Sequence, residues 1–399
     1  MVKYAERIKT MEKTGKIIRN LFNAMTDPET ISFGGGAPAR EALPVDIVRQ
    51  ITDEVMRVDS RGVTALQYGD PLGLEDLRQV VVDYLLKPKG VIADPDQVLI
   101  TTGGIETMNL ICQIFIDPGD VILVESPTFV HCVEIFQMFQ AKCVAVETDE
   151  CGMVPGDLEK KIKAYHPKVI YVVPTFNNPT GVTTTTERRQ AIAELGSRYD
   201  VIVLEDDPYR DIRYSGEDLP PIKTFDKTGN TVMANSFSKI FSPGSRLGYV
   251  VATKELISLF YQIQTATVSV TSTLSQVICA EFFKRGYYPA HHRMICDLYR
   301  ERRDTMMACF DKYFPASVKH TFPDGGMFTW VTCPPEIDTT ALLPEAEAHK
   351  VAYVAGEGFY VEGNGKGRNC MRMSFTGVTP DKIETGMQRL GKLITEKLS

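Results

Sequence analysis

Short apolar segments alternate with amphipathic segments through the middle of the chain. Segments with the length and apolar content of buried strands lie at residues 98–101, 121–124, 144–146, 169–173, 201–204, 231–234 and 247–252. Between several of them, residues 105–116, 155–165 and 185–199 carry apolar side chains at helical spacing. This alternation predicts an α/β fold with a mainly parallel central sheet and helices on both faces.

The flanking segments follow a different pattern. Helices are predicted at residues 5–25, 45–58, 254–312 (interrupted at 268–272) and 380–396, and strands at 328–331 and 369–375. We therefore predict a large domain over residues 46–289 and a smaller α+β domain over residues 290–399. An N-terminal segment, residues 1–45, is expected to associate with the smaller domain.

The composition excludes several classes of function. The chain has 399 residues, of which 43% are hydrophobic and 24% charged, as in ordinary soluble proteins. Its net charge of −7 argues against nucleic-acid binding, and no apolar run suggests a membrane span or a signal peptide. Nine cysteines without a C-x-x-C pair favour reduced thiols and a cytoplasmic location. The six histidines lack metal-ligand spacing, so no metal site is expected.

Lys239 is the most informative single residue. It lies on a predicted turn between two apolar strands, after Ser236 and Ser238 and before Arg246. A lysine is costly to bury unless it is paired or used chemically, and hydroxyls and a guanidinium are ligands for an anion. Together these residues suggest covalent capture of a phosphorylated carbonyl compound, for which pyridoxal phosphate is the candidate. An exposed loop with ordinary basic residues is the alternative.

A glycine turn supplies a second candidate anion site. Thr102-Gly103-Gly104-Ile105 joins a predicted strand to a predicted helix, where free N–H groups can bind a phosphate. The turn lacks the G-x-G-x-x-G spacing and the lysine of nucleotide-binding loops, so a nucleotide site is not indicated. Many strand-to-helix turns contain such glycines without binding an anion.

Other candidate side chains follow the predicted strands at the end where open α/β sheets bind ligands. Phe129, Asn178 and Asp206 each come shortly after one of these strands. An aspartate there can keep a pyridinium nitrogen protonated, which makes the cofactor an electron sink, and an asparagine can donate to a ligand oxygen. Taken singly, the same residues could be a core phenylalanine, a turn cap and a solvated acid.

Three further features lie outside the strand series. A run of three glycines, ending at Gly36, permits close approach of a ligand, although a flexible turn would use it too. Arg372 alternates with methionines on a predicted strand and could bind a carboxylate in bidentate fashion, but viewed alone it is more simply an exposed arginine. Tyr68 could pack within its own domain or present its hydroxyl to a site across a subunit boundary.

Taken together and in this order, the segments resemble the class I and II pyridoxal-phosphate-dependent aminotransferases over nearly the whole chain. The motifs are residues 33–38, Tyr68-Gly69, residues 102–105, Asn178-Pro179-Thr180-Gly181, Asp206-Asp207-Pro208-Tyr209, residues 236–239, Arg246, residues 325–328 and Arg372. The forms Glu-Asp-Asp-Pro-Tyr and Ser-Phe-Ser-Lys are most similar to the 2-aminoadipate, kynurenine and aromatic aminotransferases. The resemblance implies fold type I, a small domain built from both termini, and a homodimer.

The resemblance also implies a role for each candidate residue. Lys239 would hold the cofactor as a Schiff base and then transfer the α-proton, while Asp206 binds the pyridinium nitrogen. The remaining cofactor ligands would be Phe129 on the ring, Asn178 and Tyr209 at the phenolic oxygen, and Gly104, Ile105, Ser236, Ser238, Arg246 and a second subunit's Tyr68 at the phosphate. The substrate would be held by Arg372 at its α-carboxylate, near Asn178 and Gly36.

Three positions depart from the family pattern. Ile105 stands where a polar side chain is common, so only its backbone can serve the phosphate, and Phe129 replaces the commoner tyrosine. Val361-Glu362-Gly363 replaces the usual Val-Pro-Gly, which the resemblance places near the mouth of the substrate site. The implied reaction moves the amino group of an L-amino acid to a 2-oxo acid, with 2-oxoglutarate expected, by a ping-pong mechanism. The amino donor stays open.

Two alternatives to transamination remain. A lyase or another α-carbon enzyme could use the same scaffold, because a fold does not fix a reaction. A pyridoxal-phosphate-binding regulator would be a protein without enzymatic activity. The short segment before Phe33 and the negative net charge argue against the regulator.

Overall fold

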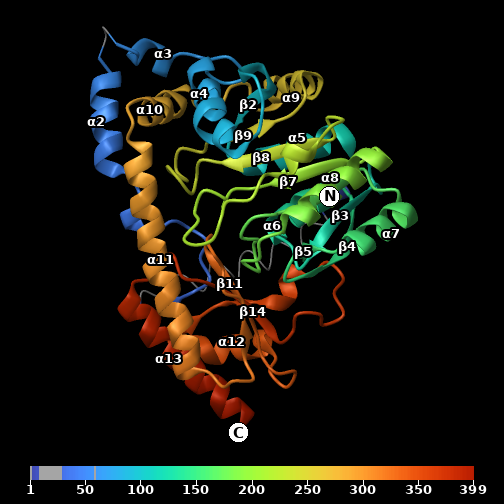
Figure 1. The fold of residues 1–399 in the computed structure, drawn as a ribbon, viewed down its shortest axis with the longest axis vertical. Helices are drawn as coiled ribbons and strands as arrows, with labels where there is room; N and C mark the ends of the chain where they lie inside the picture. Colours follow the sequence, from blue (N-terminus) through green and yellow to red (C-terminus); the bar gives the residue numbers. More distant parts are fainter. Residues whose placement is uncertain (1, 9–28, 58–59) are drawn as a thin grey trace.

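The strands predicted between residues 98 and 252 form one large sheet. The computed structural model describes residues 2–8, 29–57 and 60–399, so most of the helix predicted over residues 5–25 lies outside the described residues (Figure 1). The strands of the large sheet lie in the order β2-β9-β8-β7-β6-β3-β4-β5. Their bounds are β2 Val98–Thr101, β9 Gly248–Val251, β8 Thr231–Ser236, β7 Ile202–Asp206, β6 Val169–Val172, β3 Val121–Ser126, β4 Lys142–Asp149 and β5 Gly152–Met153.

Most of this sheet is parallel, as predicted. Strands β8, β7, β6, β3 and β4 pair in parallel, whereas β9 runs antiparallel to both β2 and β8, and β5 runs antiparallel to β4. The parallel strands therefore bring their carboxyl ends to one edge of the sheet. The connections that follow them hold most of the residues singled out above.

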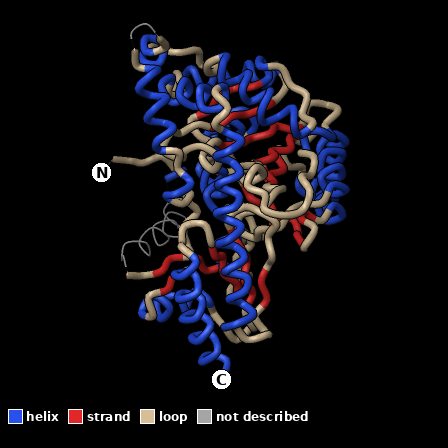
Figure 2. The backbone as a smooth tube through the Cα atoms, turned by 60° about the vertical axis from the view of Figure 1, so that its left-hand side comes forward, coloured by secondary structure: helices blue, strands red, loops and turns tan. Residues whose placement is uncertain are grey.

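Helices cover both faces of the sheet, because successive strand residues point to opposite sides and are apolar on both. Leu204 and Val250 belong to the core under one face, and Val203 and Val251 belong to cores under the other. Figure 2 shows the helices on either side of the strands. The covering helices are α4 Glu75–Val80, α5 Gly104–Phe115, α6 Val130–Met138, α7 Pro155–Tyr165, α8 Thr186–Tyr199, α9 Lys254–Thr267 and α10 Thr273–Lys284.

A second region combines the C-terminal part of the chain with residues from position 31 onward. Strand β1 (Ile31–Ser32) pairs in parallel with β12 (Val351–Ala352). A separate antiparallel sheet has the order β10-β11-β14-β13, with bounds Lys319–His320, Phe328–Thr332, Cys370–Ser374 and Val354–Ala355. Phe33, Met373 and Met387 share one core with the helices of this region, so segments distant in sequence are packed together. These helices are α11 Tyr288–Tyr313, α12 Thr339–Ala348 and α13 Pro380–Leu398.

Helix α11 joins the two regions. It begins beside the large sheet and ends against α13 in the C-terminal region (Figure 1). The boundary proposed at residue 290 falls near the start of this continuous helix. The division into residues 1–45, 46–289 and 290–399 stays a proposal.

The remaining elements are short. They are α2 Val45–Val55, α3 Gly62–Leu66, a π-helical segment Val81–Leu86, and turns of 3-10 helix at Arg40–Ala42, Lys87–Lys89, Pro95–Gln97, Ile222–Phe225 and Gly356–Phe359. Helices α3, α6 and α12 and the two-residue strands were not predicted from the sequence; strands of two residues are too short to show a period. Within the described residues, no helix has both the length and the apolar character needed to cross a membrane.

Candidate active site

Lys239 lies on the turn between β8 and β9, as predicted from the two flanking apolar strands. Its Nζ donates a hydrogen bond to the carbonyl oxygen of Gly36 at 2.8 Å, and lies 6.0 Å from the centre of the Tyr209 ring. Burial lowers the pKa of Lys239 to about 8, and the positive charges of Arg372 and Arg246 act in the same direction. A substantial fraction of this amine is therefore neutral near pH 7.5 and able to act as a nucleophile or a base.

Two serine hydroxyls lie next to each other just before this lysine. The Ser236 hydroxyl donates to Oγ of Ser238 at 2.9 Å, and accepts from the Ser238 amide at 3.1 Å. Strand β9 separates the ends of β8 and β2, and its residue Gly248 is paired with both Ser236 and Thr101. Gly248 has no side chain, so the turn after β2 approaches β8 closely across it.

The turn after β2 brings the N-terminus of α5 to these serines. A Cβ on Gly104 would lie 3.4 Å from the Cβ of Ser236. The Arg246 side chain lies on Gly103, where a Cβ would come within 2.3 Å of Nη2, and this Nη2 donates to the Thr102 carbonyl at 3.3 Å. The helix N-terminus, two hydroxyls and a guanidinium thus converge, and this is a set of donors suited to a phosphate.

Asp206 is the last residue of β7 and is buried. The hydroxyl of Tyr171, on the neighbouring strand β6, donates to its Oδ2 at 2.8 Å. Burial raises the pKa of Asp206 to about 7, the Tyr171 hydrogen bond opposes this rise, and the nearby charge of Asp207 adds to it. A cationic partner would restore the ionised carboxylate.

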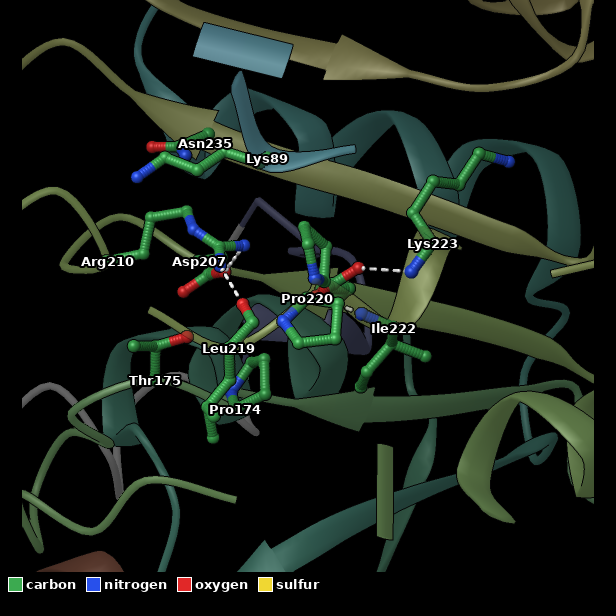
Figure 3. A network of polar contacts seen from close by, with 12 residues as sticks. Lys89, Pro174, Thr175, Asp207, Arg210, Leu219, Pro220, Ile222, Lys223 and Asn235 are labelled. Carbon is green, nitrogen blue, oxygen red and sulfur yellow. Dashed lines mark hydrogen bonds and ion pairs between the residues drawn. The ribbon is translucent and has the colours of Figure 1, made fainter. Parts of the chain in front are cut away.

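The acids on either side of Asp206 have partners of their own. Asp207 forms a fully buried ion pair with Arg210 at 2.9 Å, and Arg210 also donates to the Leu219 carbonyl (Figure 3). Both carboxylate oxygens of Glu205 accept backbone N–H groups, from Ile222 at 2.8 Å and from Lys223 at 2.9 Å. Of the three consecutive acids, Asp206 is therefore the one available to a ligand.

Arg372 is buried on β14 and forms the other side of the site. Its Nη1 donates to Oδ1 of Asn178 at 2.8 Å and its Nη2 donates to the Gly34 carbonyl at 2.7 Å. Asn178 in turn donates to the Tyr209 hydroxyl at 3.2 Å. Burial lowers the pKa of Arg372 to about 10. The simpler interpretation of this residue, an exposed arginine, is therefore wrong.

Aromatic rings support the Arg372 guanidinium. Its Cζ lies 4.3 Å from the centre of the Phe328 ring and 5.2 Å from that of Phe359. The Phe328 ring also contacts Tyr209 edge to face, with their centres 5.8 Å apart. A Cβ on Gly36 would lie 3.0 Å from this Phe328 ring, so the glycine run does permit a close approach.

Three predicted site residues make fewer contacts within the chain. Tyr68, between α3 and α4, is 85% exposed. Phe129 directly precedes α6, and its half-buried ring contacts His131 edge to face, with centres 6.1 Å apart. The Ile105 side chain packs on the core under the sheet, which leaves only its backbone for a ligand.

The charges of the site fit pyridoxal phosphate. In the described part of the chain, the hydrogen bonds recorded for Lys239, Arg246 and Arg372 all go to neutral oxygens, so these cations lack a counter-charge. Asp206, conversely, receives its hydrogen bond from a neutral hydroxyl. A phosphate near Arg246, a protonated ring nitrogen at Asp206 and a carbonyl at Lys239 would satisfy all the unmet charges except that of Arg372.

Several residues of the site were missed in the sequence analysis. Tyr171, Phe328 and Phe359 contact Asp206 or Arg372. Phe328 lies in the motif at residues 325–328 but was given no role, and the other two look in the sequence like ordinary apolar strand or loop residues. His131 lies near Arg246, and burial together with the charge of Arg246 lowers its pKa. Tyr171 and Phe328 reach the site through the pairing of neighbouring strands, and Phe359 through a loop that packs against Arg372.

Comparisons with known proteins agree with this geometry. The family described as aminotransferase class I and II matches residues 29–390. Aromatic-amino-acid aminotransferase 1 of Thermococcus litoralis is 37% identical over 386 residues, covering 96% of this chain and 92% of the relative. The 2-aminoadipate transaminase of Thermus thermophilus is 30% identical over 380 residues, covering 94% of this chain and 93% of the relative. A crystal structure of Pyrococcus horikoshii kynurenine aminotransferase has a TM-score of 0.91 at 36% identity, covering 96% of this chain and 95% of that one.

Proposed function

Because the chain belongs to the class I and II aminotransferases, whose cofactor is pyridoxal phosphate, we propose that it moves the amino group of an L-amino acid to 2-oxoglutarate in a ping-pong reaction. One observation carries this proposal. Among the described residues, three cations whose hydrogen bonds go to neutral oxygens, the half-buried Lys239, the buried Arg372 and the exposed Arg246, surround the same site as a buried carboxyl, Asp206.

Pyridoxal phosphate supplies an electrophilic carbonyl and an electron-withdrawing ring, which together acidify the α-hydrogen of an attached amino acid. Lys239 is proposed to hold the cofactor covalently, and its Nζ then takes the proton from the α-carbon and returns it during transfer. Asp206 keeps the ring nitrogen protonated. The proposed ligands of the remaining cofactor atoms are Gly104, Ile105, Ser236, Ser238 and Arg246 for the phosphate, Asn178 and Tyr209 for the phenolic oxygen, and Phe129 for the ring.

Arg372 is proposed to bind the α-carboxylate of the substrate. Its two terminal nitrogens form a planar fork that matches a carboxylate, and both now donate to neutral oxygens, of Asn178 and Gly34. A carboxylate is the stronger acceptor, so it can replace the Gly34 carbonyl with a net gain in hydrogen-bond strength. Gly36 follows Gly34 in the same glycine run, and its carbonyl accepts the hydrogen bond from Lys239.

A homodimer is proposed to complete the site. Tyr68 is 85% exposed, and Val63 and Leu66, which are close to it in sequence, are each 68% exposed, so several large apolar side chains of this segment are left without cover. Burial of this surface against a second copy would allow Tyr68 to reach the phosphate of the partner subunit. We also propose a cytoplasmic location, because nine scattered cysteines without a C-x-x-C pair favour reduced thiols.

The named activities of the relatives suggest the range of amino donors. Those relatives are named for aromatic amino acids, kynurenine and 2-aminoadipate, all of which are α-amino acids with large side chains. We propose that the donor of this protein comes from the same range. A panel of amino acids tested with 2-oxoglutarate would decide the donor and the reaction together.

The expected result is glutamate plus the 2-oxo acid of the preferred donor, with parallel lines in double-reciprocal plots. The amino acid alone should convert the cofactor in a single turnover. Release of ammonia or of a cleaved side chain, without glutamate, would instead identify a lyase.

A further inference from the structure

A polar cluster outside the proposed catalytic site joins the C-terminal region to the end of β3. Ser126, the last residue of β3, donates its hydroxyl hydrogen to Oε1 of Glu362 at 2.7 Å. Nζ of Lys366 donates to both the Ser126 hydroxyl at 3.0 Å and Glu362 Oε1 at 2.7 Å. Each of the three residues therefore contacts the other two, and we name this cluster the Ser126 latch.

The same loop is attached to the large region at two more points. The amide of Thr128 donates to the carbonyl oxygen of Phe359 at 2.9 Å. Val130, the first residue of α6, packs on the small apolar cluster that contains Phe359 and Trp330. Residues 359–366 are thus held along the connection between β3 and α6.

Between the latch residues the loop forms tight turns, in which the amides of Lys366 and Arg368 donate to the carbonyls of Gly363 and Gly365, both at 3.2 Å. Gly363, Asn364, Gly365 and Gly367 all have positive φ angles, between 61° and 75°. Such a glycine-rich segment loses much conformational entropy when it is fixed. A Cβ on Gly363 or Gly365 would meet nothing within 4 Å, so packing does not hold these positions. At the tip of this loop, residues 362–366, the side-chain attachment to β3 is therefore made by Glu362 and Lys366.

The loop connects the latch to Arg372 through Phe359. The Phe359 ring is buried, and its centre lies 5.2 Å from Cζ of Arg372. The Nε of Arg372 has no hydrogen-bond partner among the described residues, so the guanidinium is held by its two terminal nitrogens and by the rings of Phe328 and Phe359. A shift of Phe359 would change where the guanidinium fork lies.

We propose that Glu362 and Lys366 are positioning residues for substrate binding. They hold residues 359–366 on Ser126, so that Phe359 supports Arg372 in the orientation that receives the α-carboxylate. This inference rests on the proposed role of Arg372. Neither residue touches the substrate or the cofactor in this account.

The test compares the holoenzymes of Glu362→Ala, Lys366→Met and Ser126→Ala with wild type. Glu384→Ala is the matched control, because Glu384 forms an ion pair with Lys312 at 2.7 Å on the surface of the same C-terminal region. Loss of the latch should raise KM for the amino acid about tenfold and change kcat less than about twofold. This is the result expected when the ground state and the transition state lose the same amount of binding energy. Glu384→Ala should leave KM at the wild-type value.

Two further measurements distinguish positioning from general damage. Amide hydrogen exchange should become faster over residues 359–367 while the melting temperature stays near that of wild type. The half-reaction with the decarboxylated amine, which has no carboxylate for Arg372, should be unaffected. The Glu362→Ala, Ser126→Ala double variant should raise KM no more than the more affected single variant does. Both substitutions break the same cluster of three residues, so their effects are not additive.

The proposal is overturned if KM is unchanged in all latch variants, or if the amine suffers as much as the amino acid. Unchanged hydrogen exchange over the loop would overturn it as well. Should Glu362→Ala fail to fold, Glu362→Gln and Lys366→Met give the same comparison with smaller changes in volume. Failure of the wild type and of Glu384→Ala to transaminate would count against the proposed function, whereas the hydrogen exchange would still test the latch.

Discussion

The hydroxyl of Tyr171 donates a hydrogen bond of 2.8 Å to the carboxylate of Asp206. Both residues are buried, and Phe136 fixes the Tyr171 ring from its edge, with the ring centres 5.4 Å apart. The carboxylate is therefore held in one orientation at the end of β7. A small rotation would misdirect it from any ring nitrogen that it binds.

Tyr171→Phe should lower kcat while leaving the protein folded. A hydrogen bond to a charged group contributes about 1.5–3 kcal/mol, which corresponds to about a 10- to 150-fold loss if the whole contribution is expressed in the transition state. Steady-state kinetics and the melting temperature measure the two effects. Tyr199→Phe is the control, because the Tyr199 hydroxyl donates to Glu159 at 2.6 Å on the surface. Equal activity of both variants would show that Asp206 does not depend on Tyr171.

Asp206→Asn should abolish the electron sink but stabilise the apoprotein at alkaline pH. In the folded protein the pKa of Asp206 is raised to about 7 from 3.8. The folded state therefore binds this proton more tightly than the unfolded state does, and the resulting contribution to the free energy of unfolding is fully present below pH 4 and is lost as the pH rises through 7. Asparagine does not titrate. The variant apoprotein should therefore be more stable than wild type at pH 8 by about 2–4 kcal/mol, and this difference should shrink toward pH 4. Denaturant unfolding at the two pH values measures it, and a difference independent of pH would contradict the prediction.

Lys239→Ala should lower turnover by at least about 10²–10⁴-fold, since it removes both the covalent attachment and the proposed base. In wild type, borohydride reduction should fix the cofactor on Lys239, as peptide mapping can show. The amine must be neutral to attack, and burial places its pKa at about 8. The rate at which the apoprotein takes up pyridoxal phosphate should therefore rise with pH, reach half its maximum near pH 8 and level off above it. A rate that continues to rise toward pH 10 would indicate an ordinary lysine.

Arg372→Lys and Arg372→Ala should reduce kcat/KM for every α-amino acid. Loss of a charge-assisted, partly desolvated pair costs about 2–5 kcal/mol, which is about 30- to 5000-fold. The amine that lacks the carboxylate should lose little. If amino acid and amine suffer equally, Arg372 has a structural role and the carboxylate is bound elsewhere.

Tyr68 can be assigned to one subunit or the other by mixing two inactive variants. If Tyr68 serves the partner's site, a hybrid dimer of Tyr68→Ala and Lys239→Ala chains holds one intact site and one site with both defects. Refolding the two variants together should then restore activity that neither homodimer has. Absence of recovery, with hybrid formation confirmed by mass spectrometry, would place Tyr68 in its own subunit's site or in none.

The strand series could be predicted from the sequence because each strand is apolar on both faces and bounded by turn residues. The positions of Lys239, Asp206 and Asn178 followed from the same pattern, since each comes just after a strand whose end faces the site. The burial of Arg372 did not follow, because its strand also reads as a half-exposed one. Its environment depends on residues 34 and 178, which are distant in the chain.

Other features depend on contacts that leave little trace in the sequence. Strands of two residues, such as β1 and β12, are too short to show a period, although their pairing holds the N-terminal segment on the C-terminal region. The role of Tyr171 depends on the register between β6 and β7, and that of Glu362 on the return of a distant loop to Ser126. Such contacts require the folded structure.

The carbonyls of Gly34 and Gly36 have a consequence for how substrates arrive. They solvate Arg372 and Lys239 as water would, but a neutral dipole does not cancel a cation. Once a bound cofactor meets the charges of Lys239 and Arg246, the charge of Arg372 remains, so the site keeps a positive potential there inside a chain whose net charge is −7. Amino acids and 2-oxo acids enter carboxylate first into such a field, and their association should be faster at low ionic strength than at high. The Gly34 carbonyl thus leaves Arg372 able to attract an anion within a protein whose net charge repels anions.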